Sequence, residues 1–466
     1  MSEEKHVVEH EQQKKEKTKK QYKPFWIVMS FIILIVVLLL PAPSSLPIMA
    51  KAVLAILAGS DLLGTNHALS LAFSGFATSA VALVAAALFL AAAMQETNLH
   101  KRLALLVLSI VGNKTRNIVI GAIIVSIVLA FFVPSATARA GAVVPILLGM
   151  IAAFKVSKDS KLASLLIITS VQAVSIWNIG IKTAAAQNIV AINFINHQLG
   201  FDVSWGEWFL YAAPWSIVMS VALYFIMIKV MPPEINTIEG GKDLIKEELH
   251  KLGPVSPREW RLIVISMLLL LFWSTEKVLH PIDSASITII ALGVMLMPKI
   301  GVMTWKHVEN KIPWGTIIVF GVGISLGNVL LKTGAAQWLS DQTFGVLGLK
   351  HLPIIATIAL ITLFNILIHL GFASATSLSS ALIPVFISLT STLHLGDQSI
   401  GFVLIQQFVI SFGFLLPVSA PQNMLAYGTG TFTVKDFLKA GIPLTIVGYI
   451  LVIVFSMTYW KWLGLL

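Results

Sequence analysis

Long apolar runs constrain this chain more than any other feature. Residues 24–40, 207–228 and 440–458 are almost entirely apolar, and each approaches or reaches the roughly 20 residues that a helix needs to cross the hydrocarbon core of a bilayer. Only 12% of the 466 residues are charged, against about a quarter in soluble proteins. We therefore predict an all-α polytopic membrane protein, because the weakly alternating segments of a β-barrel are absent.

The polar ends and the charge balance exclude several other classes. Residues 1–23 are lysine-rich and lack the small-residue cleavage site of a signal peptide, so we expect a disordered cytoplasmic tail. The net charge of +10 does not indicate nucleic-acid binding, because the lysines cluster beside apolar spans. There is no cysteine, which excludes disulfides and thiolate metal sites. No cofactor and no metal site are expected.

A tripeptide recurs once in each half of the chain. It reads Ser135-Ala136-Thr137 in the first half and Ser374-Ala375-Thr376 in the second. About fifty residues later each half carries a Gln-Asn pair, within Ala186-Gln187-Asn188 and Pro421-Gln422-Asn423. The triplets stand 239 positions apart (135 to 374) and the pairs 235 positions apart (188 to 423). Such matched spacing is typical of a transporter built from two repeats.

Basic residues predict how the spans are oriented. They cluster at 14–23, 114–116, 155–161, 229–261, 299–306 and 435–439, and positively charged loops tend to face the cytoplasm. The segment between Arg116 and Lys155 is basic at both ends, so it enters and leaves on the same side. It could be two full crossings or a re-entrant hairpin. We favour the hairpin, because a turn that lines a cavity need not leave its backbone unsatisfied in lipid.

The second triplet is reached from the opposite side, which predicts inverted repeats. Pro-Pro, Gly-Gly and Gly-Pro breaks within 230–261 predict a cytoplasmic linker with one short amphipathic helix. The predicted order is a tail (1–23), a first transmembrane helix (24–45), a first repeat (46–229) with its tip near 134–137, the linker, and a second repeat (262–466) with its tip near 374–376. About eleven crossings and two hairpins result, with a cytoplasmic N-terminus and an extracellular C-terminus.

Each hairpin tip has the chemistry of an anion site. It combines two hydroxyls with a helix N-terminus, whose free N–H groups and positive dipole end favour an anion. Two tips facing each other would suit a substrate with a carboxylate at each end. The Gln-Asn pairs lie in apolar spans interrupted near 178–183 and 417–421, and such breaks expose backbone dipoles to a cavity. One triplet alone could merely bond to its own helix, but two matched triplets favour a site.

We predict that the tips and the Gln-Asn elements bind the substrate. The predicted substrate-binding residues are Ser135, Ala136, Thr137, Asn188, Ser374, Ala375, Thr376, Pro421, Gln422 and Asn423. Arg139, Lys182 and His369 are predicted to compensate the substrate's charge, because ionisable groups inside a membrane are costly and usually functional. Lys182 is the strongest candidate, since no carboxylate lies near it in sequence.

A purely structural role remains open for each of these three cationic residues. Lys182 could extend to the membrane surface, Arg139 could pair with a backbone carbonyl, and His369 could be a hydrogen-bonded core histidine. Tryptophans near the predicted span ends, such as Trp205 and Trp208, are expected to anchor the protein at the membrane interface.

The pattern resembles the divalent anion/sodium symporter family over nearly the whole chain. Pro134 to Ala140 is similar to the Pro-Ser-Asn-Thr-Ala-Arg of its exchanger branch, which includes 2-oxoglutarate/malate translocators and citrate/succinate antiporters. The linker sequence after Met231 and the Tyr-Gly-Thr-Gly at 427–430 also fit. The resemblance implies a homodimer, each subunit having a scaffold domain and an elevator-type transport domain.

The departures from the family pattern predict how transport is driven. Ala136 and Ala375 stand where the family usually has asparagine, and Phe131 and Leu370 stand where its symporters tend to have serine or threonine. Sodium is held by oxygen ligands, of which these sites have lost several. Fixed cations could replace the sodium. We therefore predict sodium-independent antiport of di- or tricarboxylates, such as 2-oxoglutarate, malate, succinate or fumarate, across the cell membrane.

Three other functions stay open. Backbone carbonyls at the tips could still hold sodium, so the first alternative is a sodium-coupled dicarboxylate symporter. An intramembrane hydrolase would need a serine nucleophile with a matched base, for which Ser135 and Lys182 are formally available, but the duplicated triplet would then be unexplained. A channel would need a charge-ringed pore, which the two isolated tips do not provide. We expect no enzymatic activity.

Overall fold

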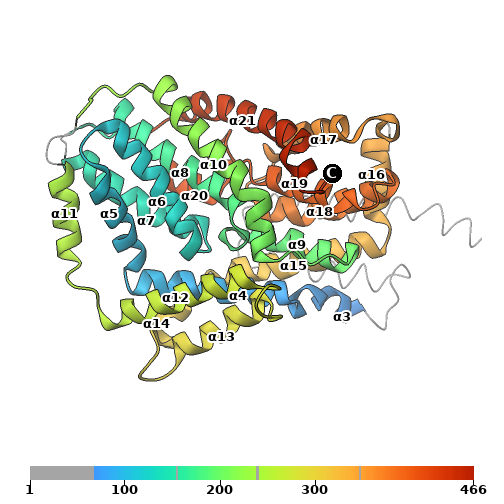
Figure 1. Cartoon of the computed structure of the whole chain (residues 1–466), viewed down its shortest axis with the longest axis horizontal. Helices are drawn as coiled ribbons and strands as arrows, with labels where there is room; N and C mark the ends of the chain where they lie inside the picture. The colour runs from blue at the N-terminus through green and yellow to red at the C-terminus, as the bar shows by residue number, and fades with distance from the viewer. Residues whose placement is uncertain (1–67, 154–155, 238–240, 346–347) are drawn as a thin grey trace, which may run out of the picture.

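The computed structural model describes residues 68–153, 156–237, 241–345 and 348–466 (Figure 1). Over these residues the chain is helical, with two isolated bridges and no strand. Seven of the described helices are long and apolar enough to cross a membrane. The prediction of an all-helical fold is confirmed for the described part of the chain. The predicted tail at 1–23 and the first transmembrane helix at 24–45 lie outside it.

The first half of the chain ends with a long helix that is fixed by its own cap. The elements are α3 (Ala68–Phe73), η2 (Ser74–Ala77), α4 (Ser79–Glu96), α5 (Leu99–Val111), α6 (Thr115–Phe132), α7 (Ala136–Ala153), α8 (Lys161–Gly180), η3 (Lys182–Ala184), α9 (Ala186–Leu199) and α10 (Trp205–Val230). Ser204 and Glu207 form a capping box that starts α10, satisfying two backbone N–H groups that would otherwise lack partners.

The second part of the chain begins with the linker helix. Its elements are α11 (Gly241–Lys251), α12 (Pro257–Thr275), α13 (Ser284–Leu296), α14 (Trp305–Val308), η4 (Glu309–Lys311), α15 (Trp314–Lys332), α16 (Ala335–Phe344), η6 (Leu349–His351), α17 (Ile354–His369), α18 (Ala375–Thr392), α19 (Gln398–Ile410), η7 (Pro417–Ser419), α20 (Pro421–Tyr427), α21 (Val434–Met457) and α22 (Tyr459–Trp462). The short helix predicted within the linker is α11.

Matched local features extend the duplication beyond the triplets. Thr97 and Thr333 end α4 and α15, and each hydroxyl donates to a carbonyl one turn earlier, at 2.9 and 2.8 Å. Each threonine is followed by a residue in the left-handed region, Asn98 (φ 58°) or Gly334 (φ 73°), where the chain turns sharply into α5 or α16. The two halves of the chain thus share a matching helix end, at α4 in the first and at α15 in the second.

Helix α8 forms the centre of the core. Every described residue of α8 after Lys161 is buried, and the helix packs against α6, α7 and α10. Figure 1 shows α5, α6, α7 and α11 at one end of the molecule and α16 and α17 at the other. Helices α4, α12 and α13 run along one side, with α4 packed on α13.

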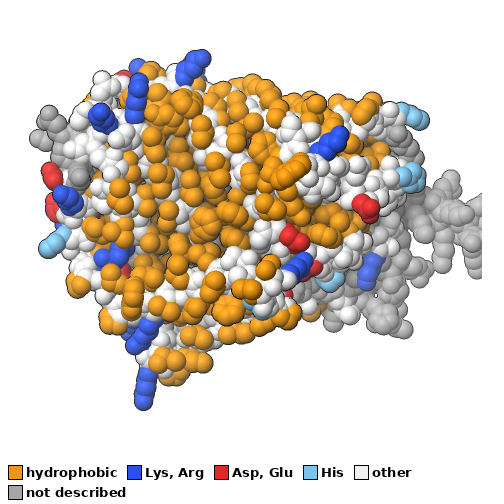
Figure 2. Space-filling view, in the orientation of Figure 1, with side chains coloured by type: hydrophobic (Ala, Val, Ile, Leu, Met, Phe, Trp, Pro, Cys, Tyr) orange, Lys and Arg blue, Asp and Glu red, His pale blue; other side chains and the backbone are white. Residues whose placement is uncertain are grey.

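The outer surface suits a lipid environment. Figure 2 shows hydrophobic side chains across the middle of the molecule, with charged side chains mainly toward its two ends. Large apolar side chains on α10, α12 and α21 are exposed, among them Phe225, Met267, Leu271, Ile446 and Ile450. An exposed apolar surface of this extent is unusual for a soluble monomer, and it agrees with the predicted membrane location.

The linker is attached to α5 by ion pairs. Arg102 Nε lies 2.8 Å from Glu259 Oε1 in a pair that is almost fully buried. The guanidinium also donates to the carbonyls of Leu252, Gly253 and Pro254. Glu248 of α11 contacts Lys101 at 3.1 Å, and hydrogen bonds from Lys251 and Lys101 hold the pKa of the Glu248 carboxyl below its usual value.

Candidate functional site

The two triplets meet at one cavity. The structure contains a partly open cavity of about 1270 Å³. Both hairpin tips contribute to its lining through the residues Ser135, Ala136, Thr137, Ser374, Ala375 and Thr376. Segments 239 positions apart in the sequence thus face the same space, as the duplicated pattern predicted.

Each tip serine caps the helix that follows it. The Oγ of Ser135 accepts a hydrogen bond from the backbone N–H of Ala138 at 3.3 Å, and the Oγ of Ser374 accepts one from Ser377 at 3.3 Å. Helices α7 and α18 therefore begin at the cavity, with their positive ends toward it. This geometry favours an anion between the tips.

The broken helices bring further backbone donors to the cavity. Helix α9 starts after Ala185 and α20 starts after Ala420; both alanines line the cavity and neither supplies a side-chain cap. An uncapped start leaves backbone N–H groups without intrahelical partners. Three helices of substantial length, α7, α9 and α18, thus begin at one cavity.

The asparagines of the two Gln-Asn pairs hold the broken helices together. Asn188 Nδ2 donates to the carbonyl of Asn178 at 2.7 Å and also reaches those of Ile181 and Lys182. Asn423 Nδ2 donates to Gly413 at 2.8 Å, likewise ten residues back. Both asparagines are fully buried and lie outside the cavity lining, so their amide groups stabilise the breaks.

The glutamines cross between the two halves. Gln187 Nε2 donates to Ser411 Oγ at 3.2 Å, and Gln422 Nε2 donates to Ser175 Oγ at 3.1 Å. Each glutamine also lines the cavity, as does Pro421. These reciprocal bonds fix the two broken helices against each other around a pseudo-two-fold axis.

Arg139 lies directly behind the first tip. It is 0% exposed, and its Nη2 donates to Asn178 Oδ1 and to the carbonyl of Ala184. Its Nε and Nη1 have no partner among the described residues. No carboxylate of the described chain pairs with it, so its charge is balanced only by dipoles. It does not itself line the cavity, but Asn178 does.

Lys182 and His369 also lie outside the cavity lining. Lys182 Nζ donates to the carbonyl of Val203 at 2.6 Å and lies 4.0 Å from Glu276 Oε2, so the carboxylate missing from its neighbouring sequence comes from the α12–α13 connection. His369 is 2% exposed and lies against the backbone of Ser419 in the second break. Their predicted charge-compensating roles stay predictions.

The expectation for two tryptophans is wrong. Trp205 and Trp208 are 4% and 0% exposed, so neither anchors the protein at a lipid interface. Their indole N–H groups donate to Thr183 Oγ1 at 3.2 Å and to the carbonyl of Ile179 at 2.8 Å. Proximity to a span end misled the interpretation, because both side chains turn inward onto the first broken helix.

Sequence reasoning missed several polar residues of the cavity. Asn178, Thr183 and Ser411 line it, although only the tips and the Gln-Asn elements were predicted to do so. Asn178 and Thr183 flank the first break, and that position could have indicated them. No acidic side chain lines the cavity within the described residues, whereas Lys311 and His100 do. The lining therefore offers hydrogen-bond donors to a ligand, while Lys311 is paired with Glu96 at the edge of the cavity.

Comparison with known proteins agrees with these features. The family described as "Sodium:sulfate symporter transmembrane region" matches residues 17–466. A "Membrane protein" of Cupriavidus necator is 49% identical over 401 residues, covering 86% of this chain and 78% of that protein. The resemblance drawn from the tips is confirmed.

Two more distant relatives carry functional names. A "Sodium-dependent dicarboxylate transporter SdcS" of Staphylococcus saprophyticus is 25% identical, covering 78% of this chain and 73% of its own. A "Citrate/succinate antiporter" of Escherichia coli is 24% identical, covering 81% and 77%. The Alcanivorax borkumensis YdaH transporter, whose crystal structure "reveals an unusual topology", matches 90% of this chain and 98% of its own with a TM-score of 0.60 at 15% identity. The last comparison supports the fold.

Proposed function

Because the chain belongs to the sodium:sulfate symporter transmembrane family and is a membrane transporter, we propose that it exchanges dicarboxylates, without sodium, across the cell membrane. The observation that carries this proposal is the cavity, where two hairpin tips and the starts of α7, α9 and α18 converge. Helix N-termini stabilise anionic groups in such sites. Two facing tips suit a substrate with a carboxylate at each end.

The absence of sodium coupling rests on residue types at the tips. Ala136 and Ala375 bring no side-chain oxygen to the cavity they line, and sodium prefers oxygen ligands. Arg139 supplies a fixed positive charge behind the first tip, without a carboxylate partner among the described residues. A buried unpaired charge is heavily penalised, so the empty site would move poorly and the loaded site would move readily. This is the condition for obligatory exchange.

The architecture supports an elevator-type movement. We assign α6 to α10 and α17 to α21, which surround the tips and breaks, to a transport domain. The remaining long helices would form a scaffold, which pairs with a second copy in a homodimer. On the distribution of basic loops, we assign the N-terminus to the cytoplasm and the C-terminus to the outside.

The alternatives differ in what they require of the site. A sodium-coupled dicarboxylate symporter needs sodium ligands, and the two alanines at the tips supply no side-chain oxygen for one. A hydrolase would need Ser135 beside a base, but Lys182 does not line the cavity and donates instead to the carbonyl of Val203. An exchanger needs neither sodium ligands at the tips nor a base beside Ser135.

Uptake by reconstituted vesicles tests this function. Vesicles loaded with unlabelled succinate should take up labelled succinate, and replacing both tip threonines (Thr137→Val with Thr376→Val) should lower uptake at least about tenfold, because each hydroxyl contributes a hydrogen bond to a charged group. Ser109→Ala is the matched control, since that hydroxyl is exposed and donates only to Leu106 on its own helix. Absence of uptake for every dicarboxylate offered would overturn the proposal.

A further inference from the structure

The two broken helices are matched in position but unlike in chemistry. Asn178 and Thr183 in the first half correspond to Gly413 and Val418 in the second, 235 positions later (178 to 413, 183 to 418). All four residues line the cavity. The first half therefore presents two polar side chains where the second half presents none.

Thr183 has a hydroxyl proton that no described residue accepts. Its Oγ1 accepts the indole N–H of Trp205 at 3.2 Å. An indole nitrogen can only donate, so the proton on Thr183 Oγ1 points away from Trp205. The residue is 5% exposed, and within the described chain its hydroxyl donates to nothing, while it lines the cavity. A buried hydroxyl in this position can donate to a ligand.

Asn178 is held in an equally defined orientation. Its Oδ1 accepts from Arg139 Nη2, and because a guanidinium has no acceptor, the oxygen of the amide must face Arg139. The Nδ2 group then faces the other way, and it makes no hydrogen bond within the described residues. Asn178 is 4% exposed and lines the cavity. Ser411, whose Oγ accepts from Gln187 of the first half at 3.2 Å, adds a second hydroxyl beside the same half.

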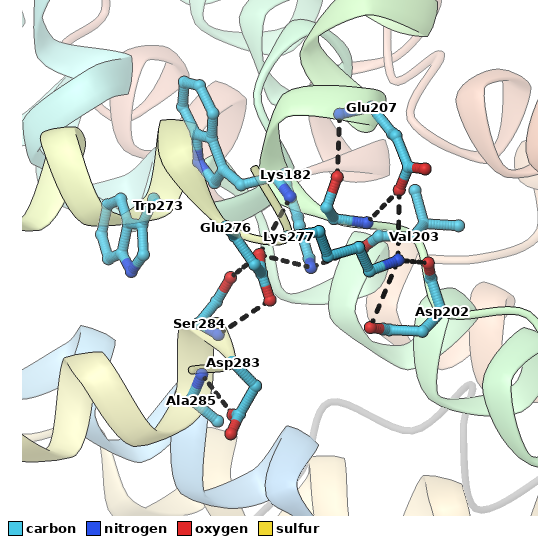
Figure 3. A network of polar contacts seen from close by, with 12 residues as sticks. Lys182, Asp202, Val203, Glu207, Trp273, Glu276, Lys277, Asp283, Ser284 and Ala285 are labelled. Carbon is cyan, nitrogen blue, oxygen red and sulfur yellow. Dashed lines mark hydrogen bonds and ion pairs between the residues drawn. The ribbon is translucent and has the colours of Figure 1, made fainter. Parts of the chain in front are cut away.

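A buried network outside the cavity fixes Trp205, and through it Thr183. Glu276 Oε2 accepts from the backbone N–H of Trp205 at 3.2 Å and from Ser284 Oγ at 2.6 Å, while Lys182 Nζ lies 4.0 Å away. Figure 3 shows Lys182 and Ser284 reaching the Glu276 carboxylate from different elements. A satisfied buried network of this kind rigidifies its members. The orientation of Thr183 is thus preset before any ligand arrives.

We propose that Asn178 and Thr183 are substrate-binding donors that make the two ends of the cavity unlike. The proposal rests on the proposed function, because it takes the ligand to be a dicarboxylate held between the tips. The two tips offer similar groups to the two carboxylates of the substrate. The donors of Asn178 and Thr183 are then available to a further acceptor oxygen of the substrate, next to one of its carboxylates. The site would favour 2-oxo and 2-hydroxy dicarboxylates over an unsubstituted dicarboxylate, and would bind them in one orientation.

Matched variants exchange the side chains of the two halves. In Thr183→Val the first half acquires the residue of the second, and in Val418→Thr the reverse. Binding of 2-oxoglutarate, malate and succinate to the purified full-length protein would be measured by titration calorimetry. Thr183→Val should weaken the binding of 2-oxoglutarate and malate about tenfold and that of succinate much less. A site built around a hydrogen bond discriminates between ligands by whether they make that bond. Val418→Thr should change all three less than about threefold, because no indole orients its hydroxyl.

Thr183→Ser is the control for a purely structural effect of changing Thr183. It keeps the hydroxyl and should retain the preference for oxo and hydroxy acids, whereas loss of that preference in Thr183→Ser would count against the proposal. Equal affinities of wild type and Thr183→Val, or equal weakening of all three acids, would overturn it while leaving dicarboxylate exchange intact. If the wild-type protein binds none of these acids, the proposed function itself fails.

Discussion

The amide of Asn188 illustrates how single residues maintain this core. Its one NH₂ group serves three backbone carbonyls at the first break, whereas the NH₂ group of Asn423 serves one at the second. These carbonyls are freed because the helix is interrupted, and buried carbonyls without a donor are destabilising. The asparagines are therefore what allows an unwound segment inside a tightly packed domain.

Removing these amides should destabilise the protein unequally. Asn188→Ala leaves up to three carbonyls unsatisfied, so we expect it to lower the free energy of unfolding by about 2–5 kcal/mol, and Asn423→Ala by about 1–3 kcal/mol. Melting temperatures of the detergent-purified variants, followed by tryptophan fluorescence, would measure the difference. If Asn188→Ala melts like the wild type and only loses substrate affinity, the asparagine contacts substrate instead.

Neutralising Arg139 should allow net uptake of substrate, without exchange for an internal substrate. Arg139→Met removes the fixed charge but keeps most of the side-chain volume, so the empty carrier should cross more readily and uptake into vesicles without internal substrate should rise relative to exchange. In Lys182→Met the same rise should be smaller, because Glu276 lies 4.0 Å from the lysine charge. Unchanged dependence on internal substrate in Arg139→Met would contradict the fixed-charge account.

The residue types at the site could be predicted from the sequence, but the directions in which their side chains point could not. The triplets, the Gln-Asn pairs and Arg139 stand out as polar groups in apolar segments. Which way an asparagine points depends on where helix breaks leave free carbonyls, and that follows from the three-dimensional path. Lys182 lacked a partner in the sequence because Glu276 lies on another pair of helices, beyond the linker.

At the scale of helices, apolar length and proline placement predicted much of the order. The predicted spans at 207–228 and 440–458 correspond to α10 and α21, which are long, capped and exposed to lipid on one face. The shorter helices were harder, since α17 and α19 have 16 and 13 residues, fewer than a crossing needs. Their membership of the repeat became clear only from the matched turns and breaks.

The docking of the linker on α5 gives a prediction at this scale. Glu259→Gln removes the anion from the buried pair with Arg102, so about 3–5 kcal/mol of stability should be lost. Lys101→Met, one residue earlier on α5, breaks a pair whose side chains are 36% and 32% exposed, and should cost at most about 1 kcal/mol. Chemical denaturation of both variants would test this ranking. Equal stabilities would show that the linker is not held by this ion pair.

At the scale of the whole molecule, the duplication explains why one cavity has two similar tips. Each repeat brings a hairpin and a broken helix, and the glutamines of each half bond to the other. The repeats have diverged in charge, since Arg139 corresponds to Leu378 (139 to 378) and Lys182 to Pro417 (182 to 417). A symmetric frame thus carries an asymmetric electrostatic field, which the proposed exchange mechanism uses.

Exchange without sodium is the central claim, and one experiment tests it directly. Labelled dicarboxylate uptake would be measured in proteoliposomes with and without internal dicarboxylate, each with and without an inward sodium gradient. The account predicts rapid uptake only when internal dicarboxylate is present, at the same rate with or without sodium. Uptake into empty vesicles driven by the sodium gradient would contradict it.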